Sequence, residues 1–427
     1  MPRLALICVL LFVAVSASAE EFSFDEAELD KKWYHLGGYA EARPALNLLD
    51  KDAAQTRLRY YDKNTDDVLP DFNGKLLLEW SLEKEWAKLF VQPSLDYTNS
   101  RLNKDLKLSW YEVWFQVKPD DSFKALLGKK SLRWGKGYAW NPVAFFDRLK
   151  NPDEPELSLE GFWLATADYV RSFDSPLKTI AVTPLILPQN HSLNDDFGSG
   201  DRINWGGKLY LLLYDTDIDL LVRGKGSRDA AYGLDFSRNL TTNFELHGEL
   251  AWELNAERPV INSAGQQTVA GGDAVSWLLG LRYLTEQDAT WILEYYRNGN
   301  GYTRQEMDVY YQNVDQAWAT WQQTGTSSQL QRLGQNQSYS RPATMQDYLY
   351  LRISQKEPWD ILYFTPALTS ITNLRDGSFS ASPELAYTGI TNLELRLKGT
   401  ALVGSRRSEY GEKPNDARIE LRVRWYF

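Results

Sequence analysis

The sequence of 427 residues has a single cysteine, Cys8, and only three histidines. A disulfide needs two cysteines, and a zinc site usually needs three or four convergent ligands, so the sequence excludes disulfides and thiolate metal sites. It has no C-x-x-C-H motif either, so the chain itself attaches no haem. Asp and Glu outnumber Lys and Arg by 57 to 47, and this acidic excess argues against a nucleic-acid partner.

Long hydrophobic runs are missing beyond the N-terminal region. A membrane-spanning helix needs about 20 predominantly apolar residues. The least charged later stretch, "TIAVTPLILPQNHSLN", is broken by Pro184 and Pro188. The mean hydropathy is −0.46, although the chain contains 16 Trp and 24 Tyr. This combination argues against a helical membrane protein and is typical of a transmembrane β-barrel, whose strands are apolar on one face only.

The N-terminal stretch "MPRLALICVLLFVAVSASAE" has the layout of a secretory signal peptide. An apolar run follows the basic residue Arg3, and the small residues Ala-Ser-Ala at 17–19 mark a cleavage site. Cys8 lies within this segment, so the mature chain has no cysteine. We expect a signal peptide at residues 1–19 that is cleaved after Ala19, a short periplasmic segment at 20–34, and a single barrel domain at 35–427.

The C-terminal stretch "ARIELRVRWYF" alternates strictly between charged and apolar side chains. Side chains on a strand alternate between two faces, so this strand has one apolar face and one charged face. The apolar face consists of Ile419, Leu421, Val423, Trp425 and Phe427. We expect this face to contact lipid, with its last two aromatic residues at the periplasmic interface. The strand should close the barrel by pairing with the first strand near residues 39–43.

Comparable alternation recurs along the chain, for example in "GKLLLEWSLE" and "NFELHGELAWE". The fold class that this pattern predicts is all-β, a transmembrane antiparallel β-barrel of 16–18 strands, with 18 preferred. We expect the strands near residues 35–45, 72–83, 87–97, 106–118, 123–131, 160–172, 177–187, 204–214, 217–225, 230–238, 242–253, 275–285, 289–297, 346–355, 361–372, 379–388, 392–402 and 417–427.

The connections between these strands alternate in length. Tight links such as "PDDS", "FDSP" and "GIT" alternate with longer segments. The longer segments are residues 46–71, 132–159, 188–203, 254–274, 298–345 and 403–416. Short periplasmic turns that alternate with long extracellular loops are the pattern of outer-membrane barrels. The phase of the alternation places both termini in the periplasm.

Two stretches resemble known families. The terminal aromatic strand that ends in Phe427 resembles the C-terminal signature of Gram-negative outer-membrane proteins, which the barrel-assembly machinery reads. The segment "LRWGKGYAWNPVAFFDRLKNPDEPE" at 132–156 is similar to a W-G-x-G…N-P segment of several porin-like and export-channel families. The resemblance implies a porin-like outer-membrane barrel and identifies no solute.

If the apolar faces contact lipid, the opposite faces line the lumen. The strand at 242–253 carries an acidic ladder, and the last two strands carry a basic group roughly across the bore. The candidate selectivity residues are Glu245, Glu249, Glu253, Arg396, Lys398, Arg418, Arg422 and Arg424. They predict a transverse field that orients dipolar or zwitterionic solutes. The alternative is that they pair with lumen neighbours and only hydrate the wall.

The segment 132–159 is the candidate constriction loop. Its Gly and Asn-Pro residues favour a tightly folded segment. The candidate residues are Trp134, Asn141, Asp147, Arg148 and Asp153, with Glu154 beside them. They either fold inward and narrow the pore or belong to an ordinary outer loop.

The longest loop, 298–345, contains a stripe of apolar and aromatic residues at spacings of three and four. The stripe predicts an amphipathic helix over about 304–323. Such a helix either covers the mouth, with aromatics available to sugars, or packs on neighbouring loops.

We expect a channel for passive diffusion of small hydrophilic solutes, with no catalytic step, no cofactor and no metal. Two alternatives stay open: a barrel that sheathes a partner such as a cytochrome, and an outer-membrane hydrolase. His247 between Glu245 and Glu249 suggests either a reactive site or a structural histidine in the lumen wall. The expected partners are outer-membrane lipid, the assembly machinery, and either a homo-oligomer or a periplasmic protein.

Overall fold

A computed structural model describes residues 32–427, apart from the side chain of residue 337. The expected signal peptide and most of the expected periplasmic segment lie outside the described residues. The sheet has eighteen strands: β1 (Tyr34–Leu49), β2 (Val68–Lys84), β3 (Ala87–Asn99), β4 (Lys104–Val117), β5 (Phe123–Lys130), β6 (Phe162–Ser172), β7 (Leu177–Gln189), β8 (Arg202–Leu213), β9 (Thr216–Arg223), β10 (Ala231–Thr241), β11 (Phe244–Ile261), β12 (Gln267–Leu284), β13 (Ala289–Arg297), β14 (Asp347–Gln355), β15 (Phe364–Asn373), β16 (Phe379–Ile390), β17 (Leu393–Val403) and β18 (Asn415–Tyr426).

The strands form a closed antiparallel barrel. Each strand pairs with its neighbours in the sequence, and β1 pairs with β18 from Tyr39↔Tyr426 to Leu49↔Asn415. The terminal residue extends this seam, because Phe427 and Gly38 exchange two backbone hydrogen bonds of 3.1 Å. Because the sheet is closed, it has no edge strand with unpaired backbone groups. An unpaired edge would be unfavourable in a bilayer, where no water satisfies these groups. The predicted fold class and the preferred count of eighteen strands are confirmed.

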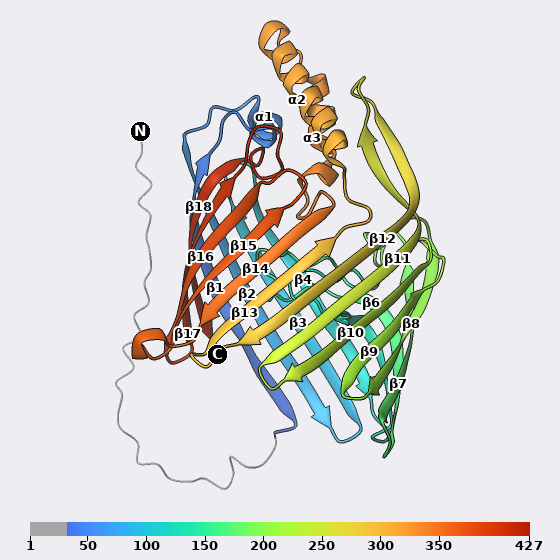
Figure 1. Cartoon of the computed structure of the whole chain (residues 1–427). Coiled ribbons are helices and arrows are strands. Elements are labelled where there is room, and N and C mark those ends of the chain that lie inside the picture. Colours follow the sequence, from blue (N-terminus) through green and yellow to red (C-terminus); the bar gives the residue numbers. More distant parts are fainter. Residues whose placement is uncertain (1–31) are drawn as a thin grey trace. The chain divides into compact units, whose positions relative to one another are not determined.

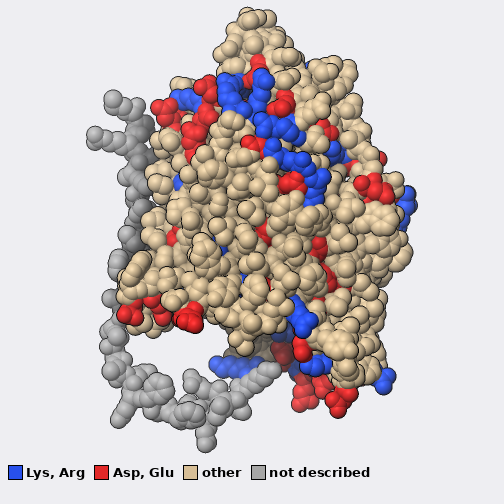
Figure 2. All heavy atoms as spheres, in the orientation of Figure 1, with Lys and Arg blue, Asp and Glu red and all other residues tan. Residues whose placement is uncertain are grey.

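The wall has an apolar outer face and a polar inner face. On β18, Ile419 and Trp425 are 58% and 51% exposed, whereas Glu420 and Arg422 are 5% and 3% exposed. Leu421 and Phe427 are also exposed, and Val423 is half-buried. Figure 2 shows a broad band of uncharged surface across the strands, with charged side chains gathered toward the two ends.

One hairpin is longer than the sequence predicts. The expected loop at 254–274 is wrong in its extent, because β11 continues to Ile261 and β12 begins at Gln267. Figure 1 shows the tip of this hairpin rising past the neighbouring strands. The β11 part of this extension packs on the helical loop, with Ile261 buried beside Tyr339, whereas most of its β12 part is exposed. The segment therefore lacks the apolar alternation that marks the other strands.

Helices gather at the end of the barrel that carries the long connections (Figure 1). They are α1 (Ala54–Tyr60), α2 (Arg304–Thr324), α3 (Ser328–Gln335) and the 3-10 helix η2 (Gln337–Ser340). A further 3-10 helix, η3 (Pro358–Asp360), lies in the short β14–β15 connection at the opposite end. The predicted helix at 304–323 is confirmed as α2. It begins with a capping box between Thr303 and Glu306 and ends at Gly325, which has a φ of 72°. None of the helices within residues 32–427 is long and apolar enough to cross a membrane.

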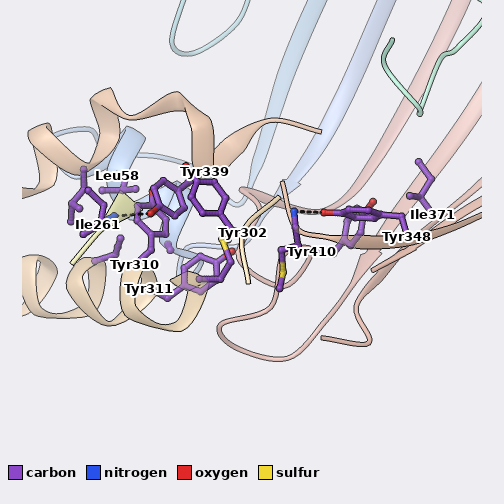
Figure 3. Close-up of a cluster of buried hydrophobic side chains, with 14 of the residues drawn as sticks. Leu58, Ile261, Tyr302, Tyr310, Tyr311, Tyr339, Tyr348, Ile371 and Tyr410 are labelled. Carbon is purple, nitrogen blue, oxygen red and sulfur yellow. Dashed lines mark hydrogen bonds between the residues drawn. The ribbon is translucent and has the colours of Figure 1, made fainter. Parts of the chain in front are cut away.

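α1 and α3 were not predicted. They have 7 and 8 residues, too few to display a helical period in the sequence. Their stability comes from packing: Leu58 of α1 and Leu330 and Leu333 of α3 are buried in one apolar cluster with Tyr310 of α2. Figure 3 shows part of this cluster, in which aromatic rings from several segments lie against one another.

The two faces of β18 give a test of which side contacts lipid. Leu421→Arg should lower the free energy of unfolding by about 2–4 kcal/mol in phospholipid vesicles, because a cation on the lipid face is poorly solvated near the midplane. Leu421→Phe, which stays apolar, should change it by less than about 1.5 kcal/mol. Urea titration of the vesicle-inserted protein measures both. Equal effects of the two substitutions would contradict lipid contact at this face.

Candidate functional site

The segment that connects β5 to β6, residues 131–161, lies inside the barrel and is called the inner loop below. Val143 and Phe146 of this loop are fully covered. Trp140 stacks on Tyr296 of β13, with 5.0 Å between ring centroids. The loop therefore packs on inward-facing side chains of the wall.

Glu249 of β11 holds the first half of the inner loop by its backbone. Its Oε1 accepts the N–H groups of Lys136 and Gly137, each at 2.6 Å, and the side-chain amide of Asn141 at 3.1 Å. Its Oε2 accepts the N–H of Val143 at 3.2 Å. Because buried N–H groups without an acceptor are costly, one carboxylate that accepts four donors allows this irregular backbone to lie inside the protein.

Glu294 of β13 holds the next part of the loop in the same way. It accepts the N–H of Ala139 at 2.9 Å and the N–H of Tyr138. Glu294 also contacts Nε2 of His247 at 2.9 Å. His247 reaches across β12 because Gly280 lies between them, and a Cβ at Gly280 would lie 2.2 Å from the imidazole. This arrangement gives His247 a structural place in the lumen wall.

Asp147 closes the inner loop on itself. Its carboxylate accepts the hydroxyl of Ser131 at 3.0 Å and the backbone N–H groups of Leu132 at 2.7 Å and Trp134 at 3.2 Å. Burial raises the pKa of Asp147 above its ordinary value, although these donors act in the opposite direction. Asp147 therefore fixes the fold of the loop and is not directed at an open lumen.

The second half of the inner loop reaches the basic wall formed by β1, β17 and β18. Both carboxylate oxygens of Glu154 accept Nη2 of Arg43, at 3.1 and 3.0 Å, and Glu154 also pairs with Arg422. Lys398 donates to the backbone carbonyl of Asp153 at 2.8 Å. Burial would raise the pKa of Glu154, but Arg422 and Arg43 outweigh burial and hold it below its usual range.

The remaining basic residues of this wall pair with strand carboxylates. Arg396 contacts Glu394 at 2.9 Å and Glu384 at 3.4 Å. Arg418 contacts Glu420 at 2.9 Å and Asp71 at 3.3 Å. In addition, Arg424 donates to Glu41 at 2.7 Å.

The outer members of the acidic ladder also have partners. Glu245 lies 3.5 Å from Nδ1 of His247, and Glu253 pairs with Arg223 at 3.1 Å. Together with the basic pairs, these contacts show that most of the candidate selectivity residues are engaged with their neighbours. Glu249 and Arg422 do not contact each other. Each contacts the inner loop, which spans the distance between the two walls.

The remaining loop candidates, Trp134 and Arg148, also have packing or ionic partners. Trp134 packs edge-on against Phe146 at 5.8 Å. Arg148 pairs with Asp196 of the β7–β8 connection and donates to the carbonyl of Glu160 at 3.1 Å. Arg148 therefore ties the loop to the β7–β8 connection, whereas Trp134 packs within the loop.

The inner loop leaves a cavity of about 250 Å³ against the basic wall. Its lining includes Arg43, Glu154, Lys398, Lys413 and Arg418. A polar cavity of this size holds water or a small solute. The loop thus occupies part of the lumen and leaves a cavity lined by charged side chains against this wall.

Above the inner loop, the aromatic stripe of α2 packs on its neighbours. Tyr310 stacks on Tyr339 with centroids 3.9 Å apart, and Tyr302 stacks on the same ring at 4.2 Å. Figure 3 shows these rings together with Tyr348 of β14, which belongs to the same cluster as Trp140 of the inner loop. The mouth and the inner loop therefore share one apolar core.

Several residues that hold the inner loop were not among the sequence candidates. They are Arg43, Lys136 and Glu294. Glu294 carried a signal, because it is the only charged residue among the inward positions of the strand "ATWILEYYR". Arg43 and Lys136 carried none, since their partners are distant in the sequence.

No protein-family model and no curated protein matches this sequence. Among solved structures, the chain is similar to OccK5 (OpdH) of Pseudomonas aeruginosa, with 11% identity and a TM-score of 0.53 over 92% of this chain and 97% of that chain. A triple mutant of the porin of Rhodopseudomonas blastica aligns at 9% identity and a TM-score of 0.46 over 92% of this chain and 100% of that chain. The likeness to OccK5 supports the barrel fold alone.

The contacts of Glu249 predict how firmly the inner loop is held. Glu249→Gln places an amide against N–H donors and should destabilise the loop by about 1–3 kcal/mol. Tryptic cleavage at Lys136 or Arg148 in the folded barrel should then accelerate by about fivefold or more. The matched control is Glu253→Gln on the same strand, which contacts Arg223 and not the loop.

Mass spectrometry of the fragments measures these rates. Equal cleavage rates in Glu249→Gln and in the control would show that this carboxylate does not hold the loop.

Proposed function

We propose that this protein is a porin-like channel of the Gram-negative outer membrane, which passes small hydrophilic solutes by diffusion. The observation that carries the proposal is an eighteen-stranded closed barrel whose lumen is crossed by a loop held at two charged walls. The apolar outer face supports a place in the bilayer. The signal peptide, with cleavage after Ala19, and the assembly signal at Phe427 remain part of the proposal.

The width of the barrel supports a hydrated pore. Strand side chains fill the interior of barrels of about eight strands, whereas barrels of 16–18 strands leave an aqueous channel unless other segments obstruct it. Here the inner loop is that segment. Its polar contacts leave charged groups along the path, such as those around the cavity at Lys398 and Arg418. Pore width and charge then determine which solutes pass.

The two walls carry charge of opposite sign. Carboxylates of β9–β13 bind the first half of the inner loop, and cations of β1, β17 and β18 bind the second half. This arrangement supports a transverse field on solutes at the constriction. Its strength is reduced wherever a wall residue is already paired, as Arg424 is with Glu41.

Diffusion through the lumen requires no catalytic step, and the neighbours of His247 support a structural role for it. Glu294, its closest partner, is engaged with the backbone of the inner loop. The inner loop also takes up lumen space that a sheathed cytochrome would need. A channel accounts for both features without a further component.

Single-channel recording of the purified protein in planar bilayers tests the proposal, and Glu154 is the residue to vary. Wild type should give a steady conductance. Glu154→Gln should raise the conductance, because the loop tip loses its ionic contacts with Arg43 and Arg422. The matched control is Glu156→Gln, whose carboxylate accepts the hydroxyl of Tyr138 within the loop at 2.7 Å. This control should stay near the wild-type conductance.

Absence of conductance in wild type and in both variants would contradict the channel. Conductance that is equal in all three would leave the channel standing and show that the Glu154 contacts do not set its width.

A further inference from the structure

Two aspartates stand side by side on the inner face of the acidic wall. Asp219 of β9 and Asp235 of β10 are direct cross-strand partners, and Asp235 is also the partner of Glu249 on β11. Asp219 is 1% exposed and Asp235 is 0% exposed. Adjacent buried carboxylates repel each other and are poorly solvated, so this row needs either a compensating positive charge or a shared proton.

The carboxylates of this row differ in how they are satisfied. Glu249 accepts the donors of the inner loop, as described above. By contrast, both oxygens of Asp235 and Oδ1 of Asp219 have no hydrogen-bond donor among the residues that the structure describes. Three buried acceptor atoms are thus directed toward a place where a donor with positive charge fits.

The side chain of Lys136, from the inner loop, occupies that place. Its Nζ lies 3.0 Å from Oδ2 of Asp219 and 3.9 Å from Oδ1 of Asp235. The same ammonium lies 5.8 Å from the centre of the Tyr210 ring. Burial would lower the pKa of Lys136, but Asp219 and Asp235 raise it above its ordinary value, so the side chain is charged.

Two further charged side chains flank this pair of aspartates. Asp217, which accepts the Tyr210 hydroxyl, adds a third carboxylate next to Asp219 and Asp235. Lys208 is the second ammonium, 3.5 Å from Oδ1 of Asp219. Three carboxyl groups therefore face two ammonium groups.

Lys136 can leave this place without disturbing the loop. Its backbone N–H is bound by Glu249 at 2.6 Å, so the main chain is held independently of the side chain. The side chain is 23% exposed, and that of Lys208 is 22% exposed. The long flexible stem of a lysine then lets the ammonium exchange between the carboxylates and lumen water.

We infer that Asp219, Asp235 and Tyr210 form a binding site for an organic cation, a primary ammonium or a guanidinium, that competes with the side chain of Lys136. Two carboxylates accept the N–H donors of such a cation, and the face of an aromatic ring attracts its charge. A metal ion is the poorer fit, since no group of three or more His, Cys, Asp or Glu in residues 32–427 is placed to hold one. The inference deepens the proposed channel by naming a solute class for its acidic wall.

The experiment uses Lys136→Met, which keeps most of the stem and removes the ammonium. The probe is ethylammonium chloride, titrated at constant ionic strength onto the detergent-solubilised full-length mature protein by calorimetry, and then into single-channel recordings. Lys136→Met should bind ethylammonium at least about tenfold more tightly than wild type, because the internal competitor is gone. In recordings, ethylammonium should interrupt the current of this variant at correspondingly lower concentrations.

Two comparisons make the result specific. Lys136→Met combined with Asp235→Asn should lose the added affinity. Lys124→Met, which removes a lysine paired at 3.0 Å with a single carboxylate, Asp168, should bind as weakly as wild type. Protease resistance of the inner loop checks that each variant is folded.

Ethylammonium binding that is equal in wild type, Lys136→Met and the double variant would overturn the inference. So would a Lys136→Met protein that responds to pH but not to ethylammonium, because the two aspartates would then share a proton and need no cation. Calorimetric binding of ethylammonium without conductance in any variant would support the cation site and contradict the channel. Conductance without ethylammonium binding would support the channel and contradict the cation site.

Discussion

The structure depends on buried carboxylates that accept backbone N–H groups inside a closed barrel. An irregular segment in the lumen brings unpaired N–H groups away from bulk water, and each one without an acceptor opposes folding. Glu249 on β11 and Glu294 on β13, the two strands that flank β12, provide these acceptors. Without them, these N–H groups would be buried with no acceptor, which would oppose the packing of Trp140 on Tyr296. This interaction fixes the inner loop between the acidic and the basic wall. It also places the side chain of Lys136 beside Asp219 and Asp235.

The strands could be predicted from the sequence because a strand with lipid on one side and water on the other carries a period of two in its side chains. That signal is local, and it fails where a strand leaves this environment, as in the outer part of the β11–β12 hairpin, whose Ile261 packs beside Tyr339. The stripe of α2 was equally readable. The short helices α1 and α3 form only because α2 offers them an apolar surface, so their own residues carry no comparable signal.

The site was predictable in part. The identity of the segment 132–159 and the charged faces of β11 and β18 are visible in the sequence, since both stand out locally. The ion pairs themselves cannot be predicted from the sequence, because closure of the barrel brings together residues that are far apart in the chain. Arg43 and Glu154 are separated by 111 residues, and Arg43 and Glu420 by 377. Arg43 and Arg422 do not lie free in the lumen but hold the inner loop through Glu154. Among the described residues, Asp219 and Asp235 are the carboxylates with buried oxygens that accept no hydrogen bond.

Amide hydrogen exchange, read by mass spectrometry on the protein in lipid nanodiscs, tests the account most directly. Peptides that cover residues 134–147 contain the N–H groups bound by Glu249 and Glu294, and the N–H of Trp134, which Asp147 binds. If these carboxylates hold the inner loop in the lumen, the peptides should exchange nearly as slowly as those of β11 and far more slowly than the exposed turn at 118–122. Exchange of 134–147 as fast as that of the turn would contradict the account, because the loop would then spend its time in water outside these contacts.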